Sequence, residues 1–376
     1  ALRGQSNSKR FSQMQVRRML IIFQFALSLC FIVFLIVFGR QYRYNLNYDY
    51  GFNTENILDI ELQGVDPAKF KSEFSRLSAI RDFSMSSDIL GLSYSSTHVR
   101  ERSSYDSVEA FQMFADSNYV RNMGLQLLAG HNFPSVFSQQ EQHVLVNEEF
   151  LRTWKIANPI DVIGKTYVIN GKELEVIGVL KNFHFAPLYE PIKSFLLRTN
   201  ASQYAYANVK VVSNDIDGTF TDMEKIWNEL SDDRKLEARF FDDEMEESYH
   251  FYWVLLKLIG YLGLLAISIS VLGLLGIVVY TTEIRIKEAG IRKVFGASQA
   301  SIMYLLSKDF LKLMVWAVGF AIPVSLLLFD DFLSELQYYR VSLNIGDILV
   351  SIVIFFLIGV VTIVSQTHKT ARANPI

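Results

Sequence analysis

The sequence has one cysteine, Cys30, among 376 residues. A single cysteine excludes an intrachain disulfide and a cluster of thiolate metal ligands. The six histidines show no HxxxH or HExxH spacing, so they form no zinc-site motif. An excess of basic charge is also lacking, because 36 lysines and arginines stand against 39 aspartates and glutamates and the formal net charge is -3. That balance argues against a nucleic-acid-binding protein.

Nucleotide-binding and hydrolase motifs are missing as well. The nearest match to a phosphate loop is residues 159–166, PIDVIGKT, which end as the pattern GxxxxGKS/T does but place Pro159 where the first glycine belongs. Proline can neither adopt a positive φ nor donate a backbone amide to a phosphate. No GxSxG nucleophile motif occurs. We therefore expect a chain that is not an enzyme and that has no catalytic residue, bound cofactor or metal site of its own.

Long apolar runs, by contrast, are abundant. Half of the residues are hydrophobic and the mean hydropathy is positive, as in a membrane protein with a folded aqueous domain. A hydrocarbon core of about 30 Å requires roughly 20 helical residues. Four runs meet or approach that length, at residues 19–39, 253–280, 310–329 and 348–365. The sequence therefore predicts four transmembrane α-helices, with a large region inserted between the first two.

Lysine and arginine counts in the short flanks predict the orientation of these spans. Residues 1–18 carry five basic residues and no acidic one, whereas the loop 330–347 carries Arg340 against four acidic residues. We expect both the N-terminal segment 1–18 and the tail 366–376 to be cytoplasmic. The loop 281–309 is then cytoplasmic too, and residues 40–252 and 330–347 lie outside the cytoplasm.

The inserted region, residues 40–252, has the pattern of a mixed α+β domain. Alternating hydrophobicity predicts strands at residues 56–62, 207–212 and 237–241. Asn170-Gly171 predicts a tight hairpin between residues 165–169 and 173–180, because both residues accept a positive φ. Helices are predicted after Asp66-Pro67, over residues 108–123 and 147–154, and from a capping box that begins at Thr221. The acidic run 241–247 would begin a helix that continues into the second span as a stalk.

The basic segment 283–298, EIRIKEAGIRKVFGAS, lies in the cytoplasmic loop. One interpretation is a surface helix whose charges merely follow the positive-inside rule. The other is a docking element, because Ile286, Ile291, Val294 and Phe295 provide apolar anchors among the charges, as in a helix that binds a groove. Gly290 and Gly296 would bracket one short helix, with Gly296 suited to a C-terminal cap.

Three stretches of the chain carry a family resemblance. The segment 283–298, preceded by the glycine-containing LGLLG of residues 272–276, resembles the FtsX-type permease domain of MacB and LolC/LolE type ABC transporters. Residues 144–148 (VLVNE), 159–165 and 175–183 (EVIGVLKNF) resemble the MacB-like periplasmic core domain. The two resemblances together cover nearly the whole chain, in the order of the family.

The resemblance implies a permease of the type VII ABC transporters, in the bacterial inner membrane. Two permease units, as a homodimer or as two halves of one chain, would pair among membrane lipids. A separate ABC ATPase would bind ATP and Mg²⁺, and its motions would change the periplasmic domains, a process called mechanotransmission. A periplasmic adaptor or outer-membrane protein is a further partner class. The residues implied in coupling to the ATPase are Glu283, Arg285, Lys287, Glu288, Gly290, Ile291, Arg292, Lys293, Val294, Phe295, Gly296, Ala297 and Ser298.

Other functional classes stay open at this point. An FtsX-like module that regulates a periplasmic cell-wall hydrolase is disfavoured by the large inserted region, and a membrane sensor without an ATPase would need a cytoplasmic output domain. The first residues, Ala1-Leu-Arg-Gly4, resemble the tail that follows an Asn-Pro pair in this family, and the chain ends near such a pair, Asn374-Pro375. We therefore expect the second half of an eight-span permease with two tandem copies, the type common in Bacteroidetes.

Overall fold

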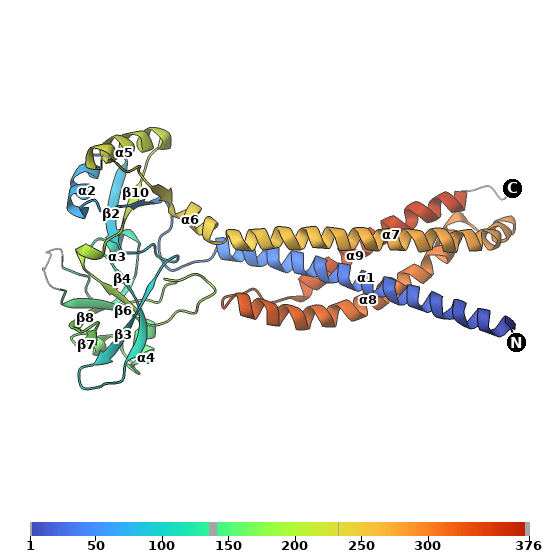
Figure 1. Ribbon diagram of the computed structural model, residues 1–376, viewed down its shortest axis with the longest axis horizontal. Coiled ribbons are helices and arrows are strands. Elements are labelled where there is room, and N and C mark those ends of the chain that lie inside the picture. Colours follow the sequence, from blue (N-terminus) through green and yellow to red (C-terminus); the bar gives the residue numbers. More distant parts are fainter. Residues whose placement is uncertain (1, 135–140, 232, 373–376) are drawn as a thin grey trace. The chain divides into compact units, whose positions relative to one another are not determined.

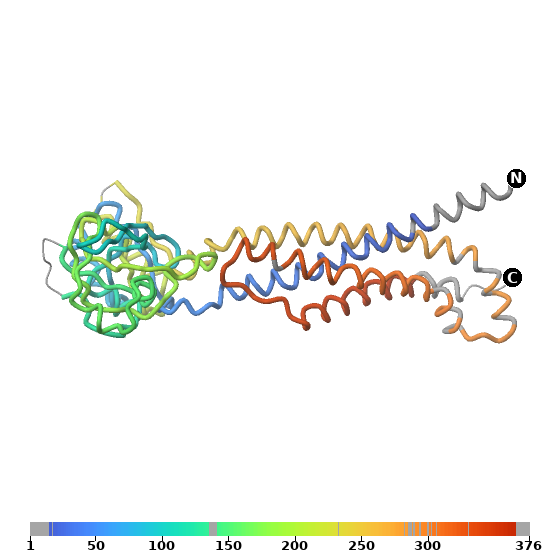
Figure 2. The backbone as a smooth tube through the Cα atoms, turned by 90° about the horizontal axis from the view of Figure 1, so that it is seen from below, coloured from blue at the N-terminus to red at the C-terminus, as the bar shows by residue number. Residues whose placement is uncertain are grey.

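The computed structural model describes residues 2–134, 141–231 and 233–372, with their side chains except at 2–14, 17, 282, 285–287, 289, 293–294, 299–300, 302, 306, 330 and 366–372. Ala1 and the Asn374-Pro375 pair lie outside the described residues. The chain divides into two compact units. We call them the helical unit (Ala1–Asn45 and Phe251–Ile376) and the inserted unit (Leu46–His250). Figures 1 and 2 show the elements of both.

Four long helices form the described part of the helical unit: α1 (Leu2–Leu46), α7 (His250–Val294), α8 (Gln299–Leu336) and α9 (Ile345–Arg372). Each contains a segment long and apolar enough to cross a membrane, namely Arg18–Leu46, His250–Thr281, Ser307–Leu336 and Ile345–Ser365. The predicted spans fall within these helices, but the helices continue beyond them. In α8 the helix runs through Pro323 to Leu336. Hydropathy marks the part that suits a bilayer and does not mark where the helix ends.

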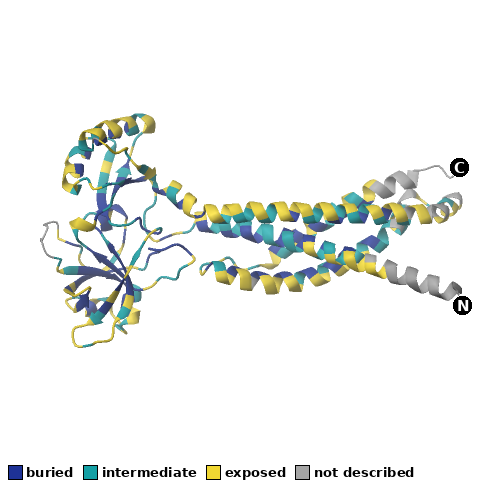
Figure 3. Ribbon diagram, viewed as in Figure 1, coloured by how far each residue is buried: buried dark blue, intermediate teal, exposed yellow. Residues whose placement is uncertain are grey.

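The long helices pack through one face each. The buried core takes Phe25, Leu29 and Val33 from α1, with further side chains from the other helices: Leu274 and Val278 of α7, Met314, Ala317 and Ala321 of α8, and Phe355 and Ile363 of α9. The outward faces are exposed, as the yellow along the helices in Figure 3 shows. They carry large apolar side chains, such as Leu262, Leu265 and Leu272 of α7. Helices that are apolar on every side suit a lipid environment.

A small antiparallel sheet forms one part of the inserted unit. Its strands follow the order β11 (Ala238–Phe240), β1 (Ile57–Glu61), β10 (Tyr206–Val211) and β2 (Ile80–Ser86). Two helices, α2 (Pro67–Phe74) and α5 (Ile216–Leu230), share a hydrophobic core with one face of this sheet. Trp227 of α5 and Phe70 and Phe74 of α2 are fully buried there.

A larger sheet of seven strands forms the second part. Its order is β5 (Leu127–Gly130), β8 (Lys172–Leu180), β6 (His143–Asn147), β9 (Phe195–Arg198), β4 (Val108–Phe114), β3 (Ser95–Glu101) and β7 (Thr166–Ile169). The pairs β4–β9 and β6–β8 are parallel. Because β7 pairs with β8 as well as with β3, six of these strands close into a ring. Val144 and Val146 of β6 pack in one hydrophobic cluster and Leu145 in another, so both faces of this strand are buried.

Local sequence signals account for several of these elements. The Asp66 carboxylate caps α2 by accepting the amides of Ala68 and Lys69 at 2.8 and 3.0 Å. Asn147 caps α4 (Glu148–Thr153) in the same way, accepting the Phe150 amide at 3.0 Å. Asn170 and Gly171 have φ values of 50° and 78°, and they join β7 to β8 as a two-residue turn. The cap at Asp66, the helix at 147–154 and this hairpin were predicted and are confirmed.

Two predicted helices differ from the structure. Residues 108–123 contain the strand β4 and the short helix α3 (Tyr119–Asn122) instead of one helix. Because β4 lies between two other strands, four of its residues in a row, 110–113, are buried and the alternation typical of a half-exposed strand is lost. Helix α5 begins at Ile216, not Thr221, with the Asp215 carboxylate as its cap.

The continuous stalk helix is also wrong. The acidic run forms α6 (Phe241–Ser248), but α6 ends there and α7 begins at His250. Tyr249 separates them with a ψ of 5°. Its ring is buried, and its hydroxyl accepts hydrogen bonds from the Tyr50 hydroxyl at 3.1 Å and from the Leu188 amide at 3.3 Å. These contacts hold Tyr249 within the inserted unit and account for the interruption.

Candidate functional site

The basic segment 283–298 lies where α7 ends and α8 begins. Gly290 is inside α7, so the segment is not a short helix between two glycines, contrary to the prediction. The helix ends at Val294, and Gly296 has a φ of 86°. The Ala297 amide donates to the Arg292 carbonyl at 2.9 Å, the long hydrogen bond that closes a helix beyond a left-handed residue. Gly296 therefore has the C-terminal capping role predicted for it.

The start of α8 is capped from the same turn. The Ser298 hydroxyl accepts the Ser301 amide at 3.3 Å, and Ser298 itself has extended backbone angles. We call residues 295–298 the α7–α8 turn. Side-chain oxygens at this position satisfy amides that the first turn of a helix leaves free. The turn is thus fixed at both ends by hydrogen bonds that its own residues supply.

Apolar side chains are exposed on α7 next to this turn. The exposed fractions are 63% for Ile284, 61% for Ile291 and 86% for Phe295. Positions 284, 288, 291 and 295 recur at helical spacing, so these side chains lie along one stripe. Ile284 was not among the predicted anchors, although the same spacing could have identified it. Large apolar side chains aligned in this way are typical of a surface that binds a partner.

Charged side chains border this stripe. Arg292 donates to the Glu288 carboxylate at 2.9 Å, and both side chains are about half exposed. An exposed pair at this spacing contributes only about 0.3–0.5 kcal/mol, so it does not lock Arg292 in place. Glu283 is exposed as well. Of the predicted coupling residues, the side chains of Arg285, Lys287, Lys293 and Val294 lie outside the described part, as does that of the predicted anchor Ile286.

Polar contacts inside the helical unit join α1 to α7. The hydroxyl oxygens of Ser28 and Ser270 are 2.9 Å apart, and the Ser270 hydroxyl also donates to the Gln24 carbonyl at 3.1 Å. Both serines are buried. Nearby, a side chain at Gly263 would lie 3.2 Å from Phe31 of α1, so the glycine permits a close approach of the two helices. Small residues and hydroxyls of this kind join helices in a membrane.

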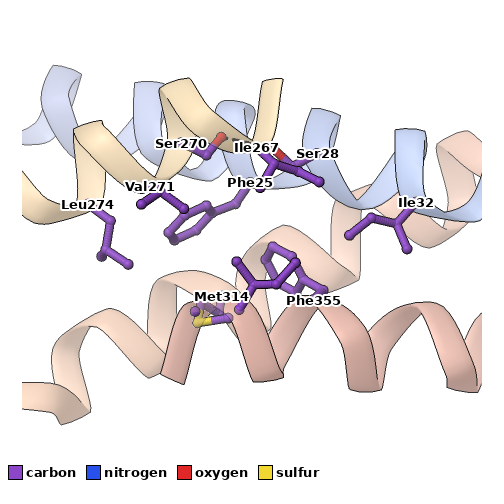
Figure 4. A pocket seen from close by; sticks show the side chains of 11 residues that line it. Phe25, Ser28, Ile32, Ile267, Ser270, Val271, Leu274, Met314 and Phe355 are labelled. Atoms are coloured by element: carbon purple, nitrogen blue, oxygen red, sulfur yellow. Dashed lines mark hydrogen bonds between the residues drawn. The ribbon is translucent and has the colours of Figure 1, made fainter. Parts of the chain in front are cut away.

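A small cavity adjoins these serines between the four long helices (Figure 4). It is lined by Phe25, Ser28, Ile32, Ile267, Ser270, Val271, Leu274, Met314, Phe355, Ile358 and Gly359. None of these lining residues carries a charged or titratable side chain. The two serine hydroxyls already pair with each other. The cavity is therefore an apolar packing gap of the bundle, with no group that could carry out chemistry.

A second cluster of polar contacts lies near the end of α1 and the beginning of α9. Arg40 of α1 forms an ion pair with Asp347, whose side chain is 7% exposed. Asp347 and Asn344 cap each other, with the Asp347 amide donating to the Asn344 side chain at 2.8 Å and the Asn344 amide donating to Asp347 at 3.2 Å. Gln41 donates to the Tyr339 carbonyl and accepts the Val341 amide. These contacts hold the α8–α9 loop against α1.

The segment that resembles a phosphate loop leads into β7 of the larger sheet. Residues Pro159–Val162 form a 3₁₀ helix, and Gly164 donates its amide to the Val176 carbonyl at 2.8 Å. Thr166 begins β7. The amide that a phosphate would need at Gly164 is thus used within the fold.

Two family models match this chain. The MacB-like periplasmic core domain matches residues 20–223, more than half of the chain, and the FtsX-like permease C-terminal model matches residues 260–375. No curated protein matches it.

Two solved structures are similar to part of the chain. The periplasmic region of MacB from Actinobacillus actinomycetemcomitans is 15% identical with a TM-score of 0.40, and the match covers 55% of this chain and 97% of that one. The extracellular domain of the noncanonic ABC-type transporter YknZ from Gram-positive bacteria is also 15% identical, with a TM-score of 0.38 and coverage of 49% and 100%.

Proposed function

Because the chain belongs to the family of ABC transporter permeases that combine a MacB-like periplasmic core domain with an FtsX-like permease domain, we propose that it is a mechanotransmitting permease. The family resemblance and the fold class predicted from the sequence are confirmed. Family membership makes the chain a membrane protein with a periplasmic domain and implies an ABC ATPase as partner. Our proposal adds the mechanism of coupling, the residues that bind the ATPase and the orientation in the membrane.

The observation that carries the proposal is the continuity of α7. Its 45 residues form one helix from His250 to Val294. At about 1.5 Å per residue it extends roughly 68 Å, more than twice a hydrocarbon core of about 30 Å. One end carries the exposed stripe of Ile284, Ile291 and Phe295. The other end follows Tyr249, which is bonded within the inserted unit. A displacement of the stripe would thus reach the inserted unit through a single helix.

The stripe and the α7–α8 turn would bind the ATPase. Ile284, Ile291 and Phe295 suit a hydrophobic groove, and Arg292 and its basic neighbours would set the orientation by charge. ATP and Mg²⁺ would bind to the ATPase, whose closure on ATP would push the turn. A second permease unit, either a second copy of this chain or a tandem half, would present a second turn to the ATPase dimer. Export or extraction of a periplasmic or membrane-derived substrate would follow.

The orientation we propose rests on charge. Arg18 flanks the first span, and the segments 1–18 and 281–309 are rich in lysine and arginine, which favours their retention in the cytoplasm. The α7–α8 turn would then face the cytoplasm and the inserted unit the periplasm. With this orientation the chain would lie in the bacterial inner membrane with both termini cytoplasmic.

Copurification tests the proposal. The full chain would be coexpressed with its cognate ABC ATPase and purified in mild detergent, and the ATPase retained per permease would be quantified. We expect stoichiometric ATPase with the wild-type chain and at least a fivefold loss for the double variant I291A/F295A, because central apolar anchors dominate interface energy. The matched control is I160A, since Ile160 is an equally exposed isoleucine of the inserted unit. The proposal is wrong if the wild-type chain retains no ATPase, and the docking residues are wrong if the double variant binds as well as I160A.

A further inference from the structure

The face of the small sheet that turns away from α2 and α5 is polar. One row of residues crosses all four strands on this face: Arg239 of β11 pairs with Asp59 of β1, Asp59 with Asn208 of β10, and Asn208 with Ser84 of β2. Asp59 is 3% exposed and Asn208 is 1% exposed. The Asn208 side chain donates to one Asp59 oxygen at 2.5 Å. A carboxylate in the centre of a sheet is thus removed from water.

Helix α6 brings a second carboxyl group to this row. The Glu244 side chain lies close enough to Asp59 for each carboxyl group to act on the pKa of the other. Asp59 Oδ2 and Glu244 Oε2 are both buried without a hydrogen-bond partner in the described part of the chain. The described ion pairs include none to either residue, whereas the nearby Arg239 is paired with Glu247 at 2.5 Å. A buried acid and a half-buried one therefore lie close together, and no described ion pair neutralises either.

Two carboxylates in contact in a low-dielectric interior cannot both stay ionised. A hydrogen bond between two carboxyl groups requires a proton on one of them, since an ionised carboxylate can only accept. We infer that Asp59 and Glu244 form a proton-binding site that holds α6 on the small sheet. In this site Glu244 keeps the proton and donates it to the Asp59 carboxylate, which also accepts from Asn208. Loss of the proton leaves two negative charges face to face and releases α6.

The groups around the pair do not replace the proton. From β11, Arg239 lowers the pKa of Glu244 to a lesser extent than burial and Asp59 raise it. From α6 itself, Glu247 adds negative charge. Asp59 also acts on the phenol of Tyr119 of α3, and both acids act on the phenol of Tyr206 of β10. Both phenols are neutral, so of these groups only Arg239 favours the ionised form of the pair.

The pKa directions agree with this geometry. Burial raises the pKa of Asp59, and burial together with the Asp59 charge raises the pKa of Glu244 from 4.5 to about 8. A carboxyl group whose pKa is raised by folding binds its proton more tightly in the folded state. The stabilisation is therefore complete below pH 4.5 and is lost as the pH rises through about 8. The site responds to pH on the side of the membrane where the inserted unit lies.

Hydrogen exchange of the full chain in lipid nanodiscs tests the inference. The protection factor of the backbone amides in α6 would be measured from about pH 6.5 to about pH 9.5, with intrinsic exchange rates divided out. From about pH 6.5 to about 8 we expect the protection to fall about tenfold per pH unit, the slope for one proton, and to level off above about 8, with no such fall in α5. E244Q keeps the shape of the side chain and a donor towards Asp59, so its α6 protection should not depend on pH. An infrared band of a protonated carboxyl should be present in the wild-type chain at neutral pH and absent in E244Q.

The control is E246Q, which removes an exposed carboxylate of the same helix that is not among the groups acting on Glu244. It should follow the wild-type profile. The inference is overturned if wild-type and E244Q profiles coincide, or if the infrared band survives in E244Q. It is also overturned if millimolar Ca²⁺ or Mg²⁺ restores protection at high pH in the wild-type chain but not in E244Q, because the pair would then bind a cation instead of a proton.

Discussion

Ser28 of α1 and Ser270 of α7 hydrogen-bond to each other inside the helical unit, with 2.9 Å between their hydroxyl oxygens. The two residues are 242 positions apart in the chain, and the inserted unit lies between them in sequence. We expect S270A to destabilise the helical unit by about 0.6–2 kcal/mol, the range for hydrogen bonds between membrane helices. S28A should cost less, because it leaves the bond from Ser270 to Gln24 in place. Thermal unfolding in detergent measures both.

S268A is the control for this pair. Ser268 is exposed on the same helix, and its hydroxyl bonds back to the Leu264 carbonyl within α7. Its removal should leave the melting temperature unchanged. If S270A melts at the same temperature as S268A, the Ser28–Ser270 bond does not hold α1 to α7.

Removing one or the other partner of the Arg40–Asp347 ion pair should lower the stability by different amounts. The Asp347 side chain is 7% exposed and that of Arg40 is 36% exposed, so R40Q strands a buried charge while D347N frees a group that water can reach. We expect R40Q to cost about 1–3 kcal/mol, below the full value for a buried pair because Arg40 is partly solvated. D347N should cost less. In a double-mutant cycle on melting temperatures, R40Q/D347N should be more stable than R40Q, and an additive result would contradict the coupling.

Gly290 and Gly296 should respond in opposite ways to alanine. A Cβ would meet nothing within 4 Å at either position, so only the backbone differs. Gly290 is helical, and G290A should stabilise α7 by up to about 1 kcal/mol. Gly296 has a φ of 86°, which costs an L-residue about 1–2 kcal/mol, so G296A should loosen the α7–α8 turn. Hydrogen exchange of the amides at residues 291–297 measures both. Equal protection in the two variants would contradict the capping role of Gly296.

The role proposed for Arg292 in binding the ATPase can be tested, with its ion-pair partner Glu288 on α7 supplying the control. R292E should lower ATPase binding and stimulated ATP hydrolysis several-fold, because it reverses a charge beside the exposed stripe. It also places two acids at helical spacing, which costs only about 0.2–0.5 kcal/mol of helix stability. The swap E288R/R292E restores that ion pair and the net charge. If the swap binds the ATPase as the wild type does, only charge at this surface matters; if R292E itself binds normally, Arg292 has no docking role.

The sequence predicted best those parts in which a local signal acts alone. The Asp66 cap and the Asn170-Gly171 turn depend on side chains within three residues, and the structure has both. The four membrane spans follow from composition over about 20 residues. The helix predicted at residues 108–123 is wrong because β4 is held between β3 and β9, and β9 is far away in sequence. Tertiary neighbours of this kind leave no trace in a single-sequence pattern.

The candidate sites, too, could be predicted only where a local sequence signal defines them. The C-terminal cap at Gly296 and the apolar side chains of Ile291 and Phe295, which the structure leaves exposed, could be predicted from residues 283–298 alone, although the length of α7 could not. Glycine at position 290 costs a helix about 1 kcal/mol and does not end it, because the residues on either side continue it. The pair of Asp59 and Glu244 was not predicted, since nothing in sequence links a strand residue to a helix 185 positions later. Only the register of the small sheet places them together.

The closure of six strands of the larger sheet into a ring restricts how the inserted unit can associate with other proteins. A ring offers no strand edge, so a partner cannot lengthen it by adding a strand. In the described part of the unit the free edges are the four-residue β5, and β11 and β2 at the ends of the small sheet. An adaptor, a cargo protein or a second copy that binds the ring itself would therefore have to be recognised through loops and side-chain surfaces. Such surfaces can change between relatives without disturbing the ring.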